Sequence, residues 1–188
     1  MKSFANLYLC TISQDLEIFP LTNADRQREI EKCSNEKVKR EKYAVFKLFQ
    51  YALKDAFDED FSDKAYKDDK GKWKVDGVEF SFSHADGVVA VLLSDEQCGV
   101  DIEKVERFLD KENLSMKLEN KVLSAEELSK LWTKKESAFK CLNKERFDYK
   151  KVDLEDKKIK TFYQEFFGKQ YCISVCGESI DNLIIKTI

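Results

Sequence analysis

Two acidic residues stand two positions apart in a short apolar stretch, Cys98 to Glu103, which reads Cys-Gly-Val-Asp-Ile-Glu. Side chains alternate between the two faces of a strand, so Asp101 and Glu103 would share one face and Val100 and Ile102 the other. Such a pair of carboxylates suits Mg²⁺, which takes one or two carboxylates, keeps several waters and is completed by substrate phosphates. The alternative is an ordinary edge strand with a solvated acidic face. The stretch alone does not separate the two interpretations.

A second stretch, Leu131 to Lys140, combines apolar and charged residues at helical spacing. Ser124 and Glu127 form a capping box ahead of it, which predicts a helix that runs to about Leu142. At about 100° per residue the apolar side chains share one face, and Lys135 falls in the middle of that face. The apolar residues on this face are Leu128, Leu131, Trp132, Ala138, Phe139 and Leu142.

Lys135 is unexpected there because burying an unpaired ammonium group is costly. Either its side chain reaches solvent or the helix packs less deeply than its pattern indicates. A third interpretation places Lys135, Glu136 and Lys140 along a cleft. Glu136 would then face Asp101 and Glu103 as a third metal ligand, and the lysines would neutralise phosphate oxygens. Metal ions with flanking ammonium groups stabilise charge at a transferring phosphoryl group.

The only histidine, His84, follows the predicted strand 78–83 and precedes a hairpin turn. It is either a structural residue or a hydrogen-bond donor to phosphate. The sequence contains no nucleophile elbow, Walker loop, Rossmann glycine pattern or zinc-ligand spacing. These absences argue against acyl-transfer, P-loop and dinucleotide-binding enzymes.

The composition predicts a soluble intracellular protein. The chain has 188 residues, of which 43% are hydrophobic and 37% charged, and a net charge of −3. This length fits one domain or two small ones with a shared core, and the charge argues against a strongly basic nucleic-acid binder. We expect neither a signal peptide nor a membrane span, and free thiols in the cytoplasm, because the cysteines form no CxxC pair. The cysteines are Cys10, Cys33, Cys98, Cys141, Cys172 and Cys176.

The order of predicted elements repeats along the chain. Residues 1–94 and 95–188 each read as a strand, then helices, then about three strands, with the stretch 58–71 as a mobile surface loop. In the first half, Thr22 or Asn23 is a candidate cap for one helix, and Ser34-Asn35 for a longer one. We therefore expect an α+β fold made of two pseudo-twofold-related small α/β halves. The cleft between such halves would be a favoured ligand site.

With these residues in place, the chain resembles the 4′-phosphopantetheinyl transferase superfamily, most closely its surfactin-synthetase-activating (Sfp-type) branch. Gly99–Glu103 matches the family's Gly-(Ile/Val)-Asp-x-Glu strand, and Trp132–Lys140 matches its Trp-(Ser/Thr)-x-Lys-Glu-(Ser/Ala)-x-x-Lys helix. Phe82-Ser83-His84 is similar to the family's Ile-Ser-His strand end, and Gly71-Lys72 to its Gly-Lys-Pro turn. Trp73 departs from the pattern because it replaces the proline of that turn.

The resemblance implies that a serine hydroxyl of an apo acyl or peptidyl carrier protein attacks the β-phosphate of coenzyme A. Phosphopantetheine is transferred and 3′,5′-ADP leaves. By the same resemblance, Asp101, Glu103 and Glu136 would hold Mg²⁺, and Glu136 would help to remove the serine proton. Lys140 would stabilise the phosphate in transit, with Lys135 nearby. Ser83 and His84 would contact the phosphates of coenzyme A, and Lys72 its adenosine end. Arg40 and Lys42 are the candidates for the 3′-phosphate.

Two other functions fit the same residue types. One is a Mg²⁺-dependent phosphodiesterase or nuclease, which would cleave nucleic acid and leave a carrier protein unchanged. The other is a non-catalytic module that binds coenzyme A or a carrier protein. The presence of all three carboxylates and Lys140 argues against the second. Because the two halves already supply a paired interface, we expect a monomer that binds neither nucleic acid nor membranes.

Overall fold

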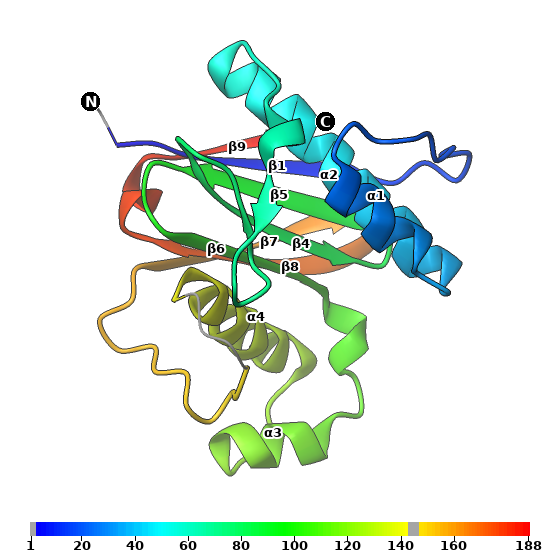
Figure 1. Cartoon of the computed structure of the whole chain (residues 1–188). Helices are drawn as coiled ribbons and strands as arrows, with labels where there is room; N and C mark the ends of the chain where they lie inside the picture. The colour runs from blue at the N-terminus through cyan, green and yellow to red at the C-terminus, as the bar shows by residue number, and fades with distance from the viewer. Residues whose placement is uncertain (1–2, 143–146) are drawn as a thin grey trace.

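Four layers stack in the order helix, sheet, sheet, helix. The computed structural model of the chain describes residues 3–142 and 147–188. The outer layers are the two longest helices, α2 (Glu36–Phe57) and α4 (Ala125–Cys141), and the two larger sheets lie between them (Figure 1). The mixed α+β class expected from the sequence is confirmed.

The first sheet has four strands in the order β4-β5-β1-β9. β1 pairs antiparallel with β5, and β5 with β4, whereas β9 pairs parallel with β1. These strands are β1 (Ala5–Thr11), β4 (Glu79–Ala85), β5 (Val88–Ser94) and β9 (Leu183–Thr187).

The second sheet has three antiparallel strands in the order β6-β8-β7. Three strands of the first sheet, β1, β5 and β4, have the same arrangement. In each of these two groups of three strands, the strand that comes last in the chain lies in the middle. In each group, too, a long helix lies between the first and second strands of the chain. However, β9 joins the first sheet, so the division into 1–94 and 95–188 remains a prediction. The three strands are β6 (Cys98–Lys104), β7 (Ile159–Phe166) and β8 (Lys169–Gly177).

Strand alternation divides the interior into two cores. One face of the first sheet, including Tyr8 and Val91, packs on Phe46 and Phe49 of α2. Its other face packs on the second sheet in a separate cluster. In β6 the residues Cys98, Val100 and Ile102 belong to that cluster, as the alternation predicted. Gly99, Asp101 and Glu103 therefore point to the opposite side, where α4 lies.

Side-chain caps account for the start of each long helix. The Asn35 side chain accepts a hydrogen bond from the Val38 backbone N–H at 3.1 Å, and α2 begins directly after Asn35, at Glu36. Ser124 and Glu127 form the predicted capping box of α4. Asn23 caps α1 (Ala24–Glu31) in the same way.

The predicted loop 58–71 is partly ordered, which corrects the sequence interpretation. It contains a 3₁₀ helix, η1 (Ser62–Lys64), and a strand, β2 (Tyr66–Lys67), that pairs with β3 (Trp73–Lys74). Buried Asn23 explains this order, because its side-chain amide donates hydrogen bonds to the Ser62 and Ala65 carbonyl oxygens.

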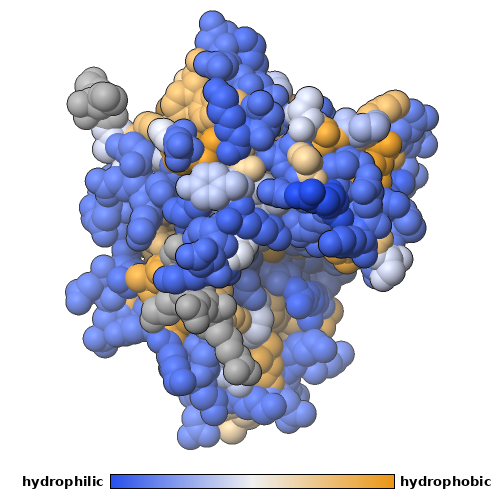
Figure 2. Space-filling view, in the orientation of Figure 1, coloured by the Kyte–Doolittle hydropathy of each residue, from blue (hydrophilic) through white to orange (hydrophobic). Residues whose placement is uncertain are grey.

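Of the remaining elements, η2 contacts α4 and η3 contacts β1 and β8. Helix α3 is far from the first sheet, at the opposite end of the molecule (Figure 1). The visible surface is mostly hydrophilic (Figure 2), in agreement with the high charged fraction. Within residues 3–142 and 147–188, no helix is both long enough and apolar enough to cross a bilayer. The elements are α3 (Glu112–Glu119), η2 (Val105–Phe108) and η3 (Glu178–Asn182).

Candidate active site at the seam between the two sheets

The two sheets meet where β4 runs beside β6. The Ser81 hydroxyl accepts a hydrogen bond from the Val100 backbone N–H at 3.1 Å, and the Ser83 hydroxyl accepts one from the Ile102 N–H at 3.2 Å. Both serines are buried. These hydroxyl groups thus accept the hydrogen bonds of β6 backbone N–H groups that the backbone of a neighbouring strand would otherwise accept. This seam places Ser83 directly beside Asp101, at 2.9 Å between hydroxyl and carboxylate oxygens.

Lys140 crosses from α4 into this seam. Its Nζ lies 2.7 Å from Asp101 Oδ1, 3.0 Å from the Val100 carbonyl oxygen and 3.2 Å from Ser83 Oγ. Burial alone would lower the pKa of Lys140, but the carboxylates of Asp101 and Glu136 raise it above its ordinary value. Lys140 is therefore an ammonium group held between β4 and β6.

Three carboxylates crowd the same region. Asp101 is 3% exposed, and its Oδ2 has no hydrogen-bond partner. Burial and the Asp101 charge raise the pKa of Glu103 to about 7, although Arg107 is paired with it. The same two causes raise the pKa of Glu136, whose Oε2 is 3.9 Å from the Lys140 Nζ. A cation would relieve the repulsion among these groups.

Small residues allow the backbone of α4 to lie directly against β6. A Cβ atom on Gly99 would lie 2.0 Å from the Ser137 carbonyl oxygen, so only glycine fits at this position. Thr133, one turn before Ser137, is fully buried and lies 2.8 Å from Ser174 Oγ of β8. Leu128 and Ala138 of the face predicted for α4 are buried as expected, but the larger apolar residues of that face are not. The residues against the sheet are mainly hydroxyl-bearing, whereas Trp132 and Phe139 are half-buried and pack on the ring of Phe147.

Lys135 and Lys72 have backbone partners. The Lys135 Nζ donates to the Val152 carbonyl at 3.0 Å, so the structure does not bring Lys135 to the group formed by Asp101, Glu136 and Lys140. The Lys72 Nζ donates to the Lys140 carbonyl oxygen at 3.2 Å. Burial lowers the pKa of Lys72. Its ammonium group lies at the C-terminal end of α4, where helix carbonyl groups favour positive charge.

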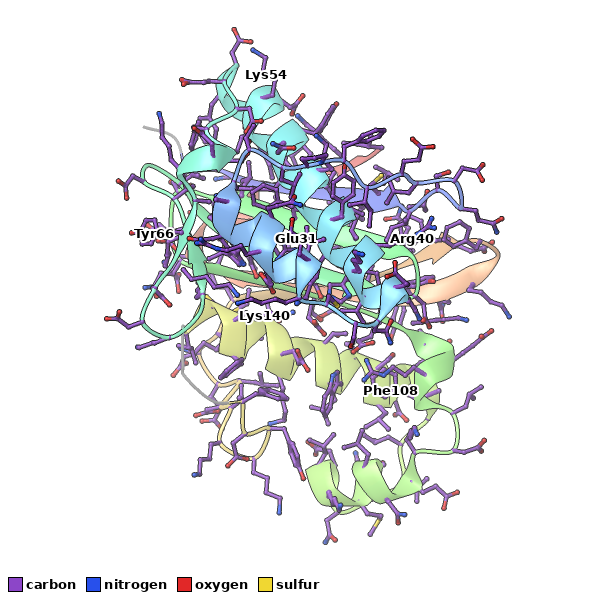
Figure 3. The ribbon with its side chains drawn as sticks, turned by 45° about the vertical axis from the view of Figure 1, so that its right-hand side comes forward. Glu31, Arg40, Lys54, Tyr66, Phe108 and Lys140 are labelled. Carbon is purple, nitrogen blue, oxygen red and sulfur yellow. The ribbon has the colours of Figure 1, made fainter. Side chains whose placement is uncertain are left out.

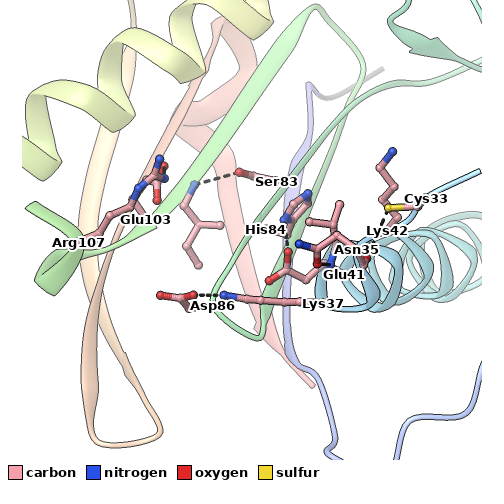
Figure 4. A network of polar contacts seen from close by, with 12 residues as sticks. Cys33, Asn35, Lys37, Glu41, Lys42, Ser83, His84, Asp86, Glu103 and Arg107 are labelled. Carbon is pink, nitrogen blue, oxygen red and sulfur yellow. Dashed lines mark hydrogen bonds and ion pairs between the residues drawn. The ribbon is translucent and has the colours of Figure 1, made fainter. Parts of the chain in front are cut away.

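His84 has a buried partner that the sequence interpretation missed. Its Nδ1 lies 3.0 Å from Oε2 of Glu41, which is 5% exposed on α2 (Figure 4). Burial opposes ionisation of Glu41, but His84, Lys37 and the Gly87 N–H together lower its pKa. A signal was present in the sequence, because Glu41 precedes Val45 by four residues and continues the apolar stripe of α2. A carboxylate in a buried stripe indicates a specific partner.

Arg40 and Lys42, the candidates for the 3′-phosphate, point to different partners. Arg40 donates to the Ser13 and Gln14 carbonyl oxygens at 2.7 and 2.6 Å, whereas Lys42 lies 2.8 Å from Glu29. Arg40 lies on α2 and Lys140 on α4 (Figure 3). Arg40 borders a hollow of about 300 Å³ next to the Glu41–His84 pair, and Lys42 does not. Its lining residues include Ser13, Gln14, Lys37, Arg40, Glu41 and Asp86.

The carboxylate groups at the seam are of the chemical type that binds a hard divalent cation. Among the described residues, no three His, Cys, Asp or Glu side chains form a group with metal-holding geometry. Asp101 nevertheless has a buried carboxylate oxygen without a partner, and burial with mutual repulsion raises the pKa of Glu103 and Glu136. Carboxylate oxygens are the ligands that Mg²⁺ prefers.

Comparison with known families agrees with this site. The family model of the 4′-phosphopantetheinyl transferase superfamily matches residues 97–187. The matched segment contains Asp101, Glu103, Glu136 and Lys140 and runs from β6 to β9. Ser83 and His84 lie outside it, on β4. No curated protein matches the chain.

Proposed function

We propose that this protein transfers 4′-phosphopantetheine from coenzyme A to a serine of an apo acyl or peptidyl carrier protein, with Mg²⁺, releasing 3′,5′-ADP. One observation carries the proposal. The Lys140 ammonium group joins Asp101 of the family-matched segment to Ser83 of the first sheet, at 2.7 and 3.2 Å. This contact between two sequence motifs that are far apart in the chain supports one shared site.

Asp101, Glu103 and Glu136 would hold Mg²⁺, which when bound neutralises the negative charge of the pyrophosphate. Lys140 adds a positive charge that is fixed in place by its backbone and hydroxyl partners. An ammonium group held in a buried site stabilises developing phosphate charge more strongly than one in water, because the local dielectric is low.

Glu136 is the candidate base for the carrier serine. Its raised pKa makes it a better proton acceptor than an ordinary carboxylate. Its side chain remains 25% exposed, so an incoming hydroxyl group can reach it. Glu103 is 9% exposed at its side chain and paired with Arg107, which makes it less suitable for that role.

His84 would contact the phosphates of coenzyme A, and Lys72 its adenosine end. His84 lies on the same strand as Ser83, and its pairing with Glu41 holds the ring through Nδ1. The other ring nitrogen is left to face a phosphate. The repeated strand order within one chain supports the Sfp-type branch and a monomer, because both sheets of the seam come from the same polypeptide.

The test is to incubate the purified protein with coenzyme A, Mg²⁺ and an apo carrier protein, and to measure the carrier's intact mass. We expect the mass to increase by one phosphopantetheine. Glu136→Gln should lower the rate at least 10²-fold, the scale of general-base catalysis. Glu126→Gln is the matched control, because Glu126 is exposed on the first turn of the same helix.

Two results would contradict the proposal. If no carrier from fatty-acid, polyketide or nonribosomal-peptide systems gains mass, transfer is not the activity. If nucleic acid is cleaved under the same conditions and Glu136→Gln stops the cleavage, the site belongs to a phosphodiesterase.

A further inference from the structure

Two cysteine residues meet at the C-terminal end of α4. Cys141 is the last residue of that helix, and Cys176 lies on β8 directly opposite Gly99 of β6. A Cβ atom on Gly99 would be 2.6 Å from the Cys141 backbone nitrogen. Because Cys141 touches the residue that Cys176 faces, the two side chains share one small space. Cys141 also packs against the small apolar cluster that contains Cys176, Ala138 and Val152.

Solvent can reach this pair from one side. Cys141 is half-buried, Cys176 is buried, and both line a hollow of about 530 Å³ that also includes Gln97 and Lys157. The Cys141 thiol donates to the Gln97 carbonyl oxygen at 3.3 Å. An oxidant that enters this hollow would therefore meet Cys141 first.

The charges around Cys141 favour its reactive form. The Cys176 thiol, Lys72 and Lys157 lower the pKa of Cys141, which outweighs the effect of burial. Cys98 is fully buried nearby, and there burial outweighs the opposing effect of Lys72 and raises the pKa strongly. The thiolate is the nucleophilic form of cysteine, and accessible thiolates beside a second thiol are typical redox sensors.

We propose that Cys141 and Cys176 form a peroxide-sensitive thiol pair that closes reversibly to a disulfide. The Cys141 thiolate attacks one oxygen of a hydroperoxide, the O–O bond breaks, and Cys141 becomes a sulfenic acid. The Cys176 sulfur then attacks the Cys141 sulfur, the S–O bond breaks, and the hydroxide leaves with the Cys176 proton as water. In total, two thiols and one hydroperoxide give one disulfide, one alcohol and one water. A dithiol reductant reverses the reaction by thiol–disulfide exchange.

The disulfide would act on the site described above. Cys141 follows Lys140 in the chain, and the Lys140 carbonyl accepts a hydrogen bond from Lys72. A covalent bond from Cys141 to β8 changes the position of this last turn and therefore of the Lys140 side chain. Oxidation is expected to slow phosphopantetheine transfer, and this consequence alone rests on the proposed function.

The experiment treats the full-length protein with hydrogen peroxide, blocks the remaining thiols with iodoacetamide, and maps the peptides by mass spectrometry. We expect a Cys141–Cys176 cross-link, a mass decrease of two hydrogen atoms, and recovery of both thiols with dithiothreitol. Cys141→Ser and Cys176→Ala should each abolish the cross-link. Cys33→Ser is the matched control, because Cys33 is also half-buried and its thiol donates to the Asn35 carbonyl oxygen, at 3.5 Å, on a different part of the molecule. This variant should form the cross-link as the unmodified protein does.

A cross-link that contains Cys98 in place of either residue would overturn the proposal. So would oxidation of Cys141 to the sulfinic acid with Cys176 still free. Equal transfer rates of the oxidised and reduced protein would refute the regulatory consequence and leave the disulfide chemistry standing. If neither form transfers phosphopantetheine, the proposed function fails, and the peptide map still decides whether the thiol pair exists.

Discussion

Replacement of Gly99 by alanine tests whether close contact between α4 and β6 holds the active site together. The new Cβ would lie 2.0 Å from the Ser137 carbonyl oxygen and 2.6 Å from the Cys141 nitrogen. Both are backbone atoms, so rotation of a side chain cannot relieve these contacts. The first contact must lengthen by about 1.4 Å to reach the 3.4 Å at which ordinary contact begins. The helix that carries Glu136 and Lys140 therefore has to move relative to Asp101.

The expected loss follows from this displacement. Overpacking by one methyl group costs about 1–3 kcal/mol where side chains can adapt, and here backbone must move, so we expect the free energy of unfolding to fall by about 3 kcal/mol or more. A shift of about 1 Å at a catalytic group lowers activity roughly 10²-fold. Urea denaturation monitored by tryptophan fluorescence measures the first effect, and the carrier-mass assay measures the second.

Gly168→Ala is the control for the general effect of removing a glycine. Gly168 has a φ of +67° in the turn between β7 and β8, and a Cβ there would meet nothing within 4 Å. The strain of a left-handed alanine costs about 1 kcal/mol, and activity should not change. If Gly99→Ala is as stable as Gly168→Ala and retains full transfer activity, close packing of α4 on β6 does not position the site.

Two further predictions concern ion pairs on α1 and α2. Glu41→Gln removes the buried charge that pairs with His84. The KM for coenzyme A should rise roughly tenfold, the scale of one charged hydrogen bond, with a smaller change in kcat. An unchanged KM would show that His84 does not take part in coenzyme A binding. Lys42 and Arg26 lower the pKa of Glu29 from 4.5 to about 2 against the opposing effect of burial. The stability that ionised Glu29 contributes is therefore complete above pH 4.5 and is lost as the pH falls towards 2. The difference in unfolding free energy between the unmodified protein and Glu29→Gln should shrink over that range in urea titrations, and a constant difference would contradict this reasoning.

Local sequence signals predicted the elements well because their causes are local. Asn35 and Ser124 accept hydrogen bonds from backbone groups three residues ahead, so the caps can be recognised without knowledge of the fold. The alternation in β6 likewise depends only on strand geometry. It separated Asp101 and Glu103 from the core side of the strand, as the structure has it.

The contacts that the sequence did not reveal join distant segments. The hydroxyl groups of Ser81 and Ser83 bond to the β6 backbone, a pairing that no periodicity records. The buried face of α4 was predicted only in part, because hydrophobic periodicity does not show that the missing side chain of Gly99 lets the α4 backbone contact β6. Lys135 stood out by its position on that predicted face, and in the structure its ammonium group has the Val152 carbonyl as partner.

The pairing of β9 with β1 has a consequence for biosynthesis. β1 spans Ala5–Thr11, and its partner Leu183–Thr187 leaves the ribosome after every other strand of either sheet. Until then, one side of β1 is an open sheet edge, with unpaired backbone groups that can attract other chains. Contacts between such distant residues also form slowly, because a long loop must close first. The nascent chain is therefore prone to aggregation until β9 docks, and a chaperone that shields β1 would act in that interval.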